Sequence, residues 1–397
     1  MEKIIDKLSS DEMAGRAYSC KGGKKASNFI ANELKKLKVS SIEKSYFQNY
    51  SYSTTDFRKT PELYVDGNKL KPAVDFYVTR QSLFVKGTFN IFPLLNDSVY
   101  TELSHMNLML KGDKSKVVLT DSFHNELKNL GYMTFAGTIF KTDNEKLYWE
   151  MPKDETILNT FTIVTNSDLI NENSKQIDLR INNRKVFNFK TRNVIGVIPS
   201  NINSDRYLMV GAHYDHLGKF GDITLPGAND NASGVATILT LIKHLYENKT
   251  NITFNHNLIF VFFSGKEAGL KGSLYFANNP PIELDKIDFF INLDAVGGNS
   301  EGITIVQGTE YPLLMEKVKE INSEKEYFSK IDFEGKSYDS DHAPLFAKGV
   351  PAVLIHTNGS DSTEYHNIYD TSEKIKLNKG KELIRFLTDF LLILDAK

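Results

Sequence analysis

Apolar and polar residues follow two different rhythms along this chain. From about residue 177 to the C-terminus, short apolar runs recur between longer segments with helical spacing. Several of these runs are continuously apolar, which is typical of strands covered on both faces. The runs are Val194–Ile198, Tyr207–Ala212, Leu258–Phe263, Phe289–Leu293, Ile303–Val306 and Ala352–Ile355. The alternation predicts an α/β fold with a mixed, largely parallel central sheet flanked by helices.

Four segments have the spacing of amphipathic or buried helices. They are Gly23–Val39, Ala232–Tyr246, Leu313–Ile321 and Lys379–Asp395. The first of them precedes the strands by more than a hundred residues. We expect it to pack on the same sheet, so that the segment between would be an insertion.

The intervening segment has the second rhythm. Residues 46–175 are rich in Thr, Tyr, Phe and Val in short runs separated by turn residues, which favours a β-rich module of short strands. The predicted organisation is therefore an α/β domain made of residues 1–45 and 176–397, with residues 46–175 inserted as a separate module.

Composition narrows the function classes. Lys and Arg number 48 against 50 Asp and Glu, so there is no basic excess to drive nucleic-acid binding. No apolar run approaches the ~20 residues that span a bilayer. Cys20 is the single cysteine, which excludes an intrachain disulfide and a cysteine-based zinc site. Charges interrupt the first residues, so no signal peptide is recognised; the chain is cytoplasmic as written, or exported if a signal was removed. Oligomeric state is not predicted.

Candidate chemistry gathers where the predicted strands end. In open α/β sheets, ligands bind outside the carboxyl ends of the strands. Each strand end here is followed by a carboxylate or an imidazole. These residues are His213, Asp215, His216, Asp230, Glu267, Asp294 and His366. Such a mixed set suits zinc, and it could hold two ions if one carboxylate bridges them. Each residue alone is also compatible with a turn, a helix cap or a buried structural histidine.

Five motifs in a fixed order resemble those of the two-zinc aminopeptidase family, which also includes glutaminyl cyclases and transferrin-receptor-like proteins. The motifs are Gly211–Gly218 (GAHYDHLG), Gly227–Gly234 (GANDNASG), Phe263–Leu270 (FSGKEAGL), Ile291–Asp294 (INLD) and Tyr365–Thr371 (YHNIYDT). The similarity covers most of residues 177–397 and reaches residues 8–39. By position and β character, the middle module is similar to the protease-associated insertion of many relatives.

The resemblance implies a division of roles. His213 and Asp294 would bind one zinc ion and Glu267 and His366 the other. Asp230 would bridge the two. The ions would bind the scissile carbonyl oxygen and lower the pKa of a water. The implied activity is hydrolysis of N-terminal residues from peptides, with a peptide as the substrate.

Two further residues receive supporting roles from the same resemblance. Asp215 would orient the metal-bound histidine beside it. Tyr365 resembles the tyrosine that polarises the developing oxyanion. His216 and the segment Ser340–His342 are weaker candidates, and we expect that segment to shape the pocket.

One position departs from the family pattern. The family usually carries two adjacent glutamates, a general base followed by a zinc ligand, whereas this chain has Lys266 and Glu267. The ligand is kept and lysine stands at the general-base position. An ammonium cannot accept a proton, so activity is expected to be impaired unless Lys266 acts as a neutral amine. A non-catalytic member serving a binding role is the alternative, and a glutaminyl cyclase is disfavoured because the bridging set with His213 is intact.

Overall fold

The computed structural model describes residues 1–42, 44–82, 84–94, 114–120, 136–143, 146–149, 160–166, 168–298, 301–358 and 364–396. Its largest element is a nine-stranded mixed sheet in the order β1-β11-β15-β12-β16-β19-β17-β18, with β2 paired to β11. The strands are β1 (Ser40–Ser41), β2 (Phe47–Phe57), β11 (Asn183–Ile198), β12 (Tyr207–His213), β15 (Asn257–Phe263), β16 (Ile287–Leu293), β17 (Gly302–Val306), β18 (Lys330–Phe333) and β19 (Ala352–Asn358).

The centre of this sheet is parallel and buried. Neighbouring strands β15, β12, β16 and β19 all run in the same direction, while β11 and β17 run antiparallel to their inner neighbours. Every described position of β15 is buried, because helices cover both faces and no side of the strand meets water. The predicted mixed, largely parallel sheet is confirmed.

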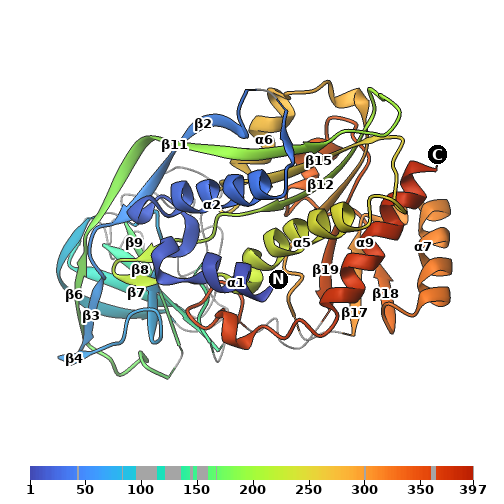
Figure 1. The fold of residues 1–397 in the computed structure, drawn as a ribbon. Coiled ribbons are helices and arrows are strands. Elements are labelled where there is room, and N and C mark those ends of the chain that lie inside the picture. The colour runs from blue at the N-terminus through green and yellow to red at the C-terminus, as the bar shows by residue number, and fades with distance from the viewer. Residues whose placement is uncertain are drawn as a thin grey trace.

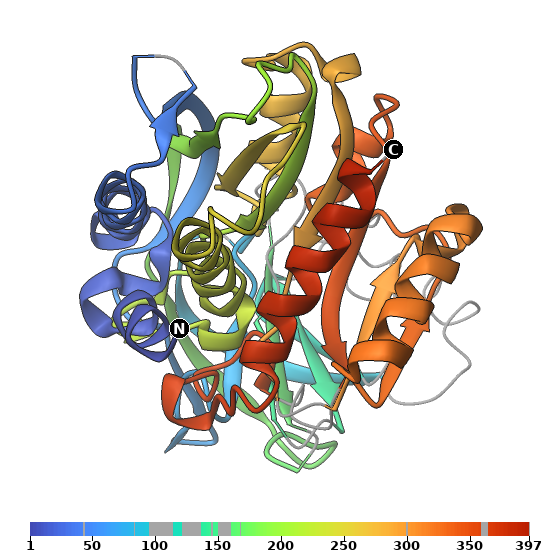
Figure 2. The same cartoon turned by 45° about the vertical axis from the view of Figure 1, so that its right-hand side comes forward.

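Helices form the two outer layers (Figures 1 and 2). On one face, α2, α5 and α9 pack against the sheet, and α6 and α8 contact strands from the other face. The helices are α1 (Glu2–Ser9), α2 (Gly22–Lys36), α5 (Ser233–Glu247), α6 (Lys271–Asn278), α7 (Pro312–Lys325), α8 (His342–Phe346) and α9 (Gly380–Asp395). The early helix α2 does pack on the large sheet, as its apolar face predicted, with Ile30 and Leu34 fully buried.

A second sheet of eight strands forms most of the inserted module. Its order is β4-β3-β10-β6-β7-β8-β9-β5. The strands are β3 (Glu62–Val65), β4 (Asn68–Lys69), β5 (Phe76–Val78), β6 (Val85–Leu94), β7 (Lys116–Thr120), β8 (Gly137–Thr142), β9 (Phe161–Asn166) and β10 (Gln176–Ile181). Several segments of the range 46–175 lie outside the described residues.

The module in the structure differs at both ends from the range 46–175 that the sequence predicted. Strand β10 belongs to the second sheet although it lies beyond residue 175, and β2 belongs to the large sheet although it lies after residue 46. The reason is that β2 and β11 form one long antiparallel ribbon, paired from Phe47 with Val194 to Phe57 with Asn183. This ribbon runs from the large sheet to the second sheet (Figure 1).

A loop of the large sheet reaches into the apolar core of the inserted module. The loop after β12 carries a small two-stranded sheet, β13 (Lys219–Phe220) and β14 (Ile223–Thr224). From this loop, Leu217, Phe220 and Leu225 are buried in the core of the module. The loop that begins with the candidate ligands is therefore held by the module's apolar residues.

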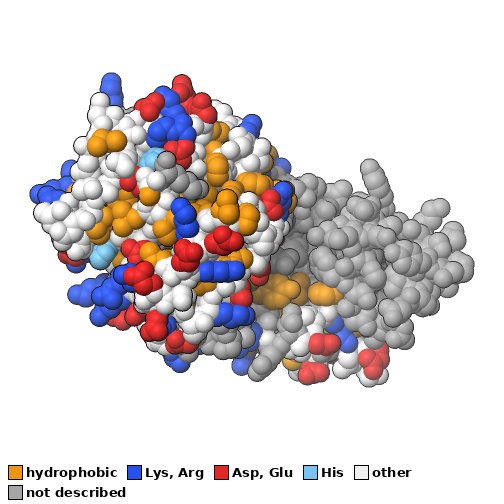
Figure 3. All heavy atoms as spheres, turned by 90° about the vertical axis from the view of Figure 1, so that its right-hand side faces the viewer, with side chains coloured by type: hydrophobic (Ala, Val, Ile, Leu, Met, Phe, Trp, Pro, Cys, Tyr) orange, Lys and Arg blue, Asp and Glu red, His pale blue; other side chains and the backbone are white. Residues whose placement is uncertain are grey.

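The face on the side of α7 and β18 carries both signs of charge (Figure 3). Among the described residues on this face, Lys and Arg side chains alternate with Asp and Glu over short distances, and apolar side chains lie between them. This agrees with the formal net charge of -2. None of the described helices combines the length and the apolar character needed to cross a membrane.

Candidate metal centre

The topology brings the strand-end residues to one edge of the large sheet. His213 ends β12, Glu267 follows β15 in the next loop, and Asp294 directly follows β16. His366 lies in the chain after β19. Asp230 lies in η3 (Ala228–Ala232), the turn that leads into α5. Because β12, β15, β16 and β19 are parallel neighbours, their carboxyl ends face the same way and their loops meet.

Around His213, three of the five expected ligands form one group. The Nε2 atom of His213 lies 3.2 Å from Oδ1 of Asp230 and 3.1 Å from Oδ1 of Asp294. The other ring nitrogen, Nδ1, is 3.0 Å from the backbone oxygen of Asp215. If Nδ1 donates to that oxygen, Nε2 keeps its lone pair and points toward the two carboxylates, as a metal ligand requires.

The second group forms around the other oxygen of Asp230. Nε2 of His366 lies 3.0 Å from Oδ2 of Asp230 and 3.4 Å from Oε2 of Glu267. Each oxygen of Asp230 thus faces a different histidine, which is the arrangement that a bridging carboxylate needs. The structure brings all five residues together, and their role as ligands stays a prediction.

His216 contributes more to the site than the sequence indicated. Its Nδ1 atom lies 3.6 Å from Oδ2 of Asp230 and 3.5 Å from Oε1 of Glu267, and the ring is 1% exposed. Its ring stacks edge-on against His366 with centroids 5.7 Å apart. Among the residues that the structure describes, two groups of side chains could hold an ion: His213, Asp230 and Asp294 form one, and His216, Asp230 and Glu267 form the other. In the sequence, the feature that could have indicated this role is the position of His216, three residues after His213 in the same loop.

The hydrogen bonding of the candidate ligand atoms indicates whether a metal ion would fit between them. Buried atoms that lack a hydrogen-bond partner gather here among the described residues: both ring nitrogens of His216 and of His366, both oxygens of Asp230, and Oε1 of Glu267. Unpaired buried polar atoms are costly and are rare in native proteins. Imidazole nitrogens and carboxylate oxygens converging on one point suit zinc, so the residues fit a bound ion.

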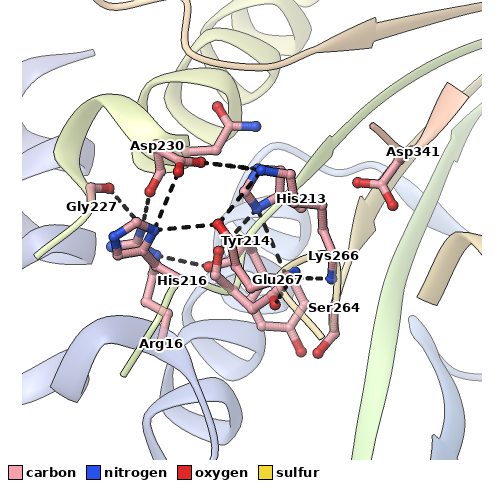
Figure 4. Close-up of polar contacts among 12 residues, drawn as sticks. Arg16, His213, Tyr214, His216, Gly227, Asp230, Ser264, Lys266, Glu267 and Asp341 are labelled. Carbon is pink, nitrogen blue, oxygen red and sulfur yellow. Dashed lines mark hydrogen bonds and ion pairs between the residues drawn. The ribbon is translucent and has the colours of Figure 1, made fainter. Parts of the chain in front are cut away.

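Lys266 points into this cluster and not away from it (Figure 4). Its Nζ atom lies 3.5 Å from Oε1 of Glu267 and 3.7 Å from a carboxylate oxygen of both Asp230 and Asp294. The side chain is 8% exposed. Burial lowers the pKa of Lys266, but the three carboxylates outweigh burial and raise that pKa well above its usual value. In the metal-free chain the lysine is an ammonium and not a base.

The same charges shift the pKa values of the expected ligands. Burial alone would raise the pKa of Asp230 and of Glu267, yet the Lys266 ammonium and the neighbouring histidines hold both pKa values well below normal. Burial lowers the pKa of His366, but Glu267 and Asp230 raise it to about 9. The carboxylates are therefore ionised around neutral pH, the form in which they bind a metal.

Asp215 holds the backbone that carries Lys266 and Glu267. Its carboxylate accepts the backbone N–H of Lys266 at 3.2 Å and that of Glu267 at 3.3 Å. Its Oδ1 atom is 3.9 Å from Nδ1 of His213, so the contact that orients His213 comes from the backbone oxygen of Asp215. Burial raises the pKa of Asp215 to about 7.

Further contacts fix the remaining loops. Ser340 donates its hydroxyl to Asp294 at 2.7 Å, and Asp370 accepts the backbone N–H of Asn229 and of Asp230. Arg16, in the segment after α1, is buried and donates to backbone oxygens that include those of Tyr214 and Gly227. The sequence assigned no role to Arg16 or Asp370, although Asp370 lies within the motif Tyr365–Thr371 and Arg16 within residues 8–39, which the resemblance also reaches.

Asp341 and Tyr365 differ in burial. Asp341 is fully buried and accepts the hydroxyl of Ser273 at 2.5 Å, so it supports the protein interior and does not face solvent as a pocket wall would. Tyr365 is 48% exposed, and its ring stacks on that of His366 at 3.7 Å between centroids. A pocket of about 430 Å³ is lined by Asp230, Tyr365 and Glu364 among others.

The inserted module contacts the site directly. The backbone N–H of Trp149 donates to the backbone oxygen of His366 at 2.8 Å. Lys146 forms an ion pair with Glu364 at 2.6 Å. His366 itself has a positive φ of 54°, a conformation that a histidine adopts only when its surroundings hold it. The module is one of those surroundings.

Comparison with curated proteins gives relatives that include leucine aminopeptidases. The chain is 27% identical over 213 residues to a probable leucine aminopeptidase of Trichophyton verrucosum, covering 51% of this chain and 56% of that protein. It is 26% identical over 220 residues to leucine aminopeptidase 1 of Arthroderma gypseum, covering 51% and 58%. The chain thus spans about half the length of the curated relatives it matches.

Solved structures share the whole fold at low sequence identity. A zinc aminopeptidase from Bacillus subtilis, BSAP, superposes with a TM-score of 0.74 at 19% identity, covering 98% of this chain and 92% of that one. A peptidase M28 precursor from Shewanella amazonensis gives 0.76 at 18% identity, covering 100% and 93%. These likenesses extend over the module as well as the α/β domain.

The family model described as Peptidase family M28 matches residues 193–390. That range begins in β11, ends in α9, and contains every expected ligand of the metal centre. The α/β domain of this chain, over residues 193–390, therefore belongs to Peptidase family M28.

Proposed function

We propose that the chain is a zinc-dependent metallopeptidase of aminopeptidase type, which removes N-terminal residues from peptides at a centre of two zinc ions. The ligands in this proposal are His213, Asp230, Glu267, Asp294 and His366. The observation that carries it is the placement of Asp230, whose two oxygens each face a different histidine at 3.2 and 3.0 Å. The relatives named as aminopeptidases support the same reaction.

The pocket beside the centre has room for the N-terminal residue of a peptide. Its volume of about 430 Å³ lies within the usual range for small-molecule sites. Asp230 and Glu364 line it, so carboxylates lie beside the space for a free α-ammonium group, and Glu364 is also ion-paired with Lys146 and Lys374. Tyr365 lies at its exposed wall and would donate its hydroxyl to the oxyanion that develops on the scissile carbonyl.

Bound zinc supplies Lewis acidity toward the carbonyl and lowers the pKa of a water. The chain's own residues position this chemistry. Asp215 fixes the turn that carries Glu267, and the backbone of Trp149 holds that of His366. What the chain does not provide at the usual position is a carboxylate that takes the proton from the water, because Lys266 stands there.

The lysine favours a second candidate, a non-catalytic family member that binds metal and peptide. A missing general base typically costs ~10²–10⁴-fold in rate. The ammonium of Lys266 lies among the ligands and has a raised pKa, so it cannot take over that role in the metal-free chain. Slow hydrolysis and no hydrolysis are the outcomes that separate the two candidates.

The test uses amino-acid anilides together with N-acetylated anilides as matched substrates. Protein stripped with a chelator and then supplied with zinc is assayed with each. We expect zinc-dependent release of chromophore from the free amine substrates and none from the acetylated ones, because an aminopeptidase requires the α-ammonium group. Zinc binding without turnover of any free substrate would favour the binding candidate. Equal turnover of free and acetylated substrates would contradict the aminopeptidase assignment.

A further inference from the structure

The ammonium of Lys266 is surrounded by carboxylates as a bound metal cation would be. A catalytic base would not have these contacts. The ammonium lies 3.5–3.7 Å from one oxygen of each of three carboxylates, Asp230, Glu267 and Asp294. The three come from different loops and are all expected zinc ligands. The side chain of Lys266 extends toward Glu267 (Figure 4), and its Nζ atom lies within 3.7 Å of all three carboxylates.

The position of the ammonium spans both predicted zinc sites. Asp294 belongs to the group around His213, Glu267 belongs to the group around His366, and Asp230 joins the two. One positive charge thus faces a carboxylate of each site and the bridge between them. Without a counter-charge, three carboxylates that are at most 13% exposed would repel one another at this separation.

The carboxylate oxygens of Asp230, Glu267 and Asp294 cannot bind two zinc ions while the ammonium of Lys266 keeps its present position. Zinc binds a carboxylate oxygen at ~2 Å, so two ions would lie within a few ångströms of the present position of Nζ. A dication and an ammonium at that distance repel strongly, because burial limits screening. Full occupation by zinc therefore requires the ammonium to move out or the ions to bind less tightly.

The chain around Lys266 allows the side chain to move without the loop. The backbone N–H of Lys266 donates to Asp215, and its backbone oxygen accepts the N–H groups of Gly269 and Leu270, both at 3.0 Å. These bonds hold the main chain in place. The lysine side chain has four rotatable bonds, and displacement of Nζ would change these torsions without breaking the main-chain hydrogen bonds.

We propose that Lys266 is a tethered counter-ion that competes with zinc for the carboxylates of Asp230, Glu267 and Asp294. It stabilises the metal-free chain and opposes loading of the centre, so that metal occupancy and hence activity follow the zinc supply. This inference rests on the proposed metal centre. It differs from a structural ion pair, which would stabilise the metal-free and the metal-bound protein equally.

The test compares Lys266→Gln and Lys266→Met with wild type, in stripped and zinc-supplied protein. Lys249→Gln is the matched control, because Lys249 is an exposed lysine in the turn after α5. We expect stripped Lys266 variants to melt below wild type and to gain more in melting temperature when zinc is added. Zinc affinity, measured against a chelating dye, should rise about tenfold or more in both variants, since a unit charge beside the ions is removed. The control should match wild type.

The outcomes separate failure of this inference from failure of the metal centre. Zinc binding of equal affinity in wild type and both variants overturns the competition and leaves the centre intact. If zinc affinity in all of these proteins is also unchanged by Asp230→Ala, the centre itself is wrong. Equal loss of stability in the stripped and zinc-supplied forms would make Lys266 a structural ion pair and would also overturn the proposal.

A second measurement uses wild-type protein alone and keeps the test independent of the variants' folding. An amine-reactive ester labels lysines, and mass spectrometry compares the peptide that contains Lys266 with the one that contains Lys249. We expect zinc to increase labelling of Lys266 severalfold relative to Lys249, because the displaced ammonium reaches solvent. Unchanged or reduced labelling in zinc-loaded protein would contradict displacement.

Discussion

The α/β domain and the inserted module are both built on a mixed sheet, but they use their strands differently. In the α/β domain, the central strands are buried on both faces, as β15 is at every position. In the module, strands such as β10 alternate between exposed and buried positions. The expected metal ligands lie at the strand ends of the large sheet. The module contributes an apolar core and backbone hydrogen bonds to the loops that carry them. The comparison indicates that one region carries the reacting groups and the other holds their loops.

Two contacts between the regions involve residues of the metal centre or their neighbours in the chain. Leu217 follows His216 and is buried in the module's core, and Trp149 donates its backbone N–H to His366. The loop that carries His216 and the loop that carries His366 are therefore both held by residues of the module. Changes in either region should affect the site, but through different measured quantities.

The largest effect is expected from Asp230→Ala in the α/β domain. Removing the bridge should eliminate zinc-dependent stabilisation and lower any aminopeptidase turnover by ~10³-fold or more, since bound ions supply several kcal/mol of transition-state stabilisation. Calorimetry with and without zinc, together with anilide assays, measures both. The control is Asp205→Ala, an aspartate whose side chain is 76% exposed. A variant that still gains stability from zinc would place the ions elsewhere.

Next in size is Trp149→Ala in the module. Trp149 is 1% exposed and stacks on Tyr77, so truncation should cost about 3–5 kcal/mol of unfolding free energy. Zinc affinity should fall as well, because the backbone N–H of residue 149, which donates to His366, loses the buried ring that holds it in place. The control is Leu63→Ala, a buried core residue of β3 at the other end of the sheet order. If both variants weaken zinc binding equally, the module acts only through overall stability.

Lys266→Glu restores a carboxylate at the position of the general base. Assayed at saturating zinc, turnover should rise by ~10²-fold, the usual size of a general-base contribution. Lys266→Ala separates the two readings of the wild-type lysine. Lower activity in Lys266→Ala would identify the lysine as a base, while equal or higher activity would identify it as an obstruction. An inactive Lys266→Glu across many N-terminal residues would replace the enzyme assignment by the binding one.

The smallest effect concerns the pH dependence of stability. Burial raises the pKa of Asp341 to about 6, above its unfolded value of ~3.9. The raised value means that the stabilisation is complete below about pH 4 and is lost as pH rises through about 6. Asp341→Asn should remove roughly 3 kcal/mol of this fall in metal-stripped protein, as measured by denaturant unfolding between pH 4 and 7. An unchanged pH profile would mean that Asp341 titrates normally.

Much of the fold followed from the sequence because its strands are continuously apolar. The range Leu258–Phe263 became β15, and Ala232–Tyr246 became α5 almost residue for residue. The short helix α6 was missed, since its eight residues show little apolar periodicity. The ribbon of β2 and β11 was missed because strand pairing across more than a hundred residues leaves no local pattern.

The site was predictable in its members but not in its geometry. Strand ends and motif order indicated the five expected ligands. The contacts of His216 depend on how its loop turns back after β12, and spacing alone left this open. The direction of Lys266 depends on side-chain torsions, which the surrounding carboxylates decide. The hydrogen bond from Trp149 to His366 joins two regions that share no sequence pattern.

The ribbon of β2 and β11 gives the molecule the topology of a single hairpin with a very large loop. Ser51 pairs with Lys190 and Tyr52 with Phe189. The chain therefore enters the module through β2 and leaves it through β11 at neighbouring positions. Residues 54–187 could be replaced by a two-residue turn without re-threading the large sheet. Because loop closure depends only weakly on length, modules of other sizes can occupy the same place at similar entropic cost. The requirement on any replacement is to cover Leu217, Phe220 and Leu225, which the present module buries.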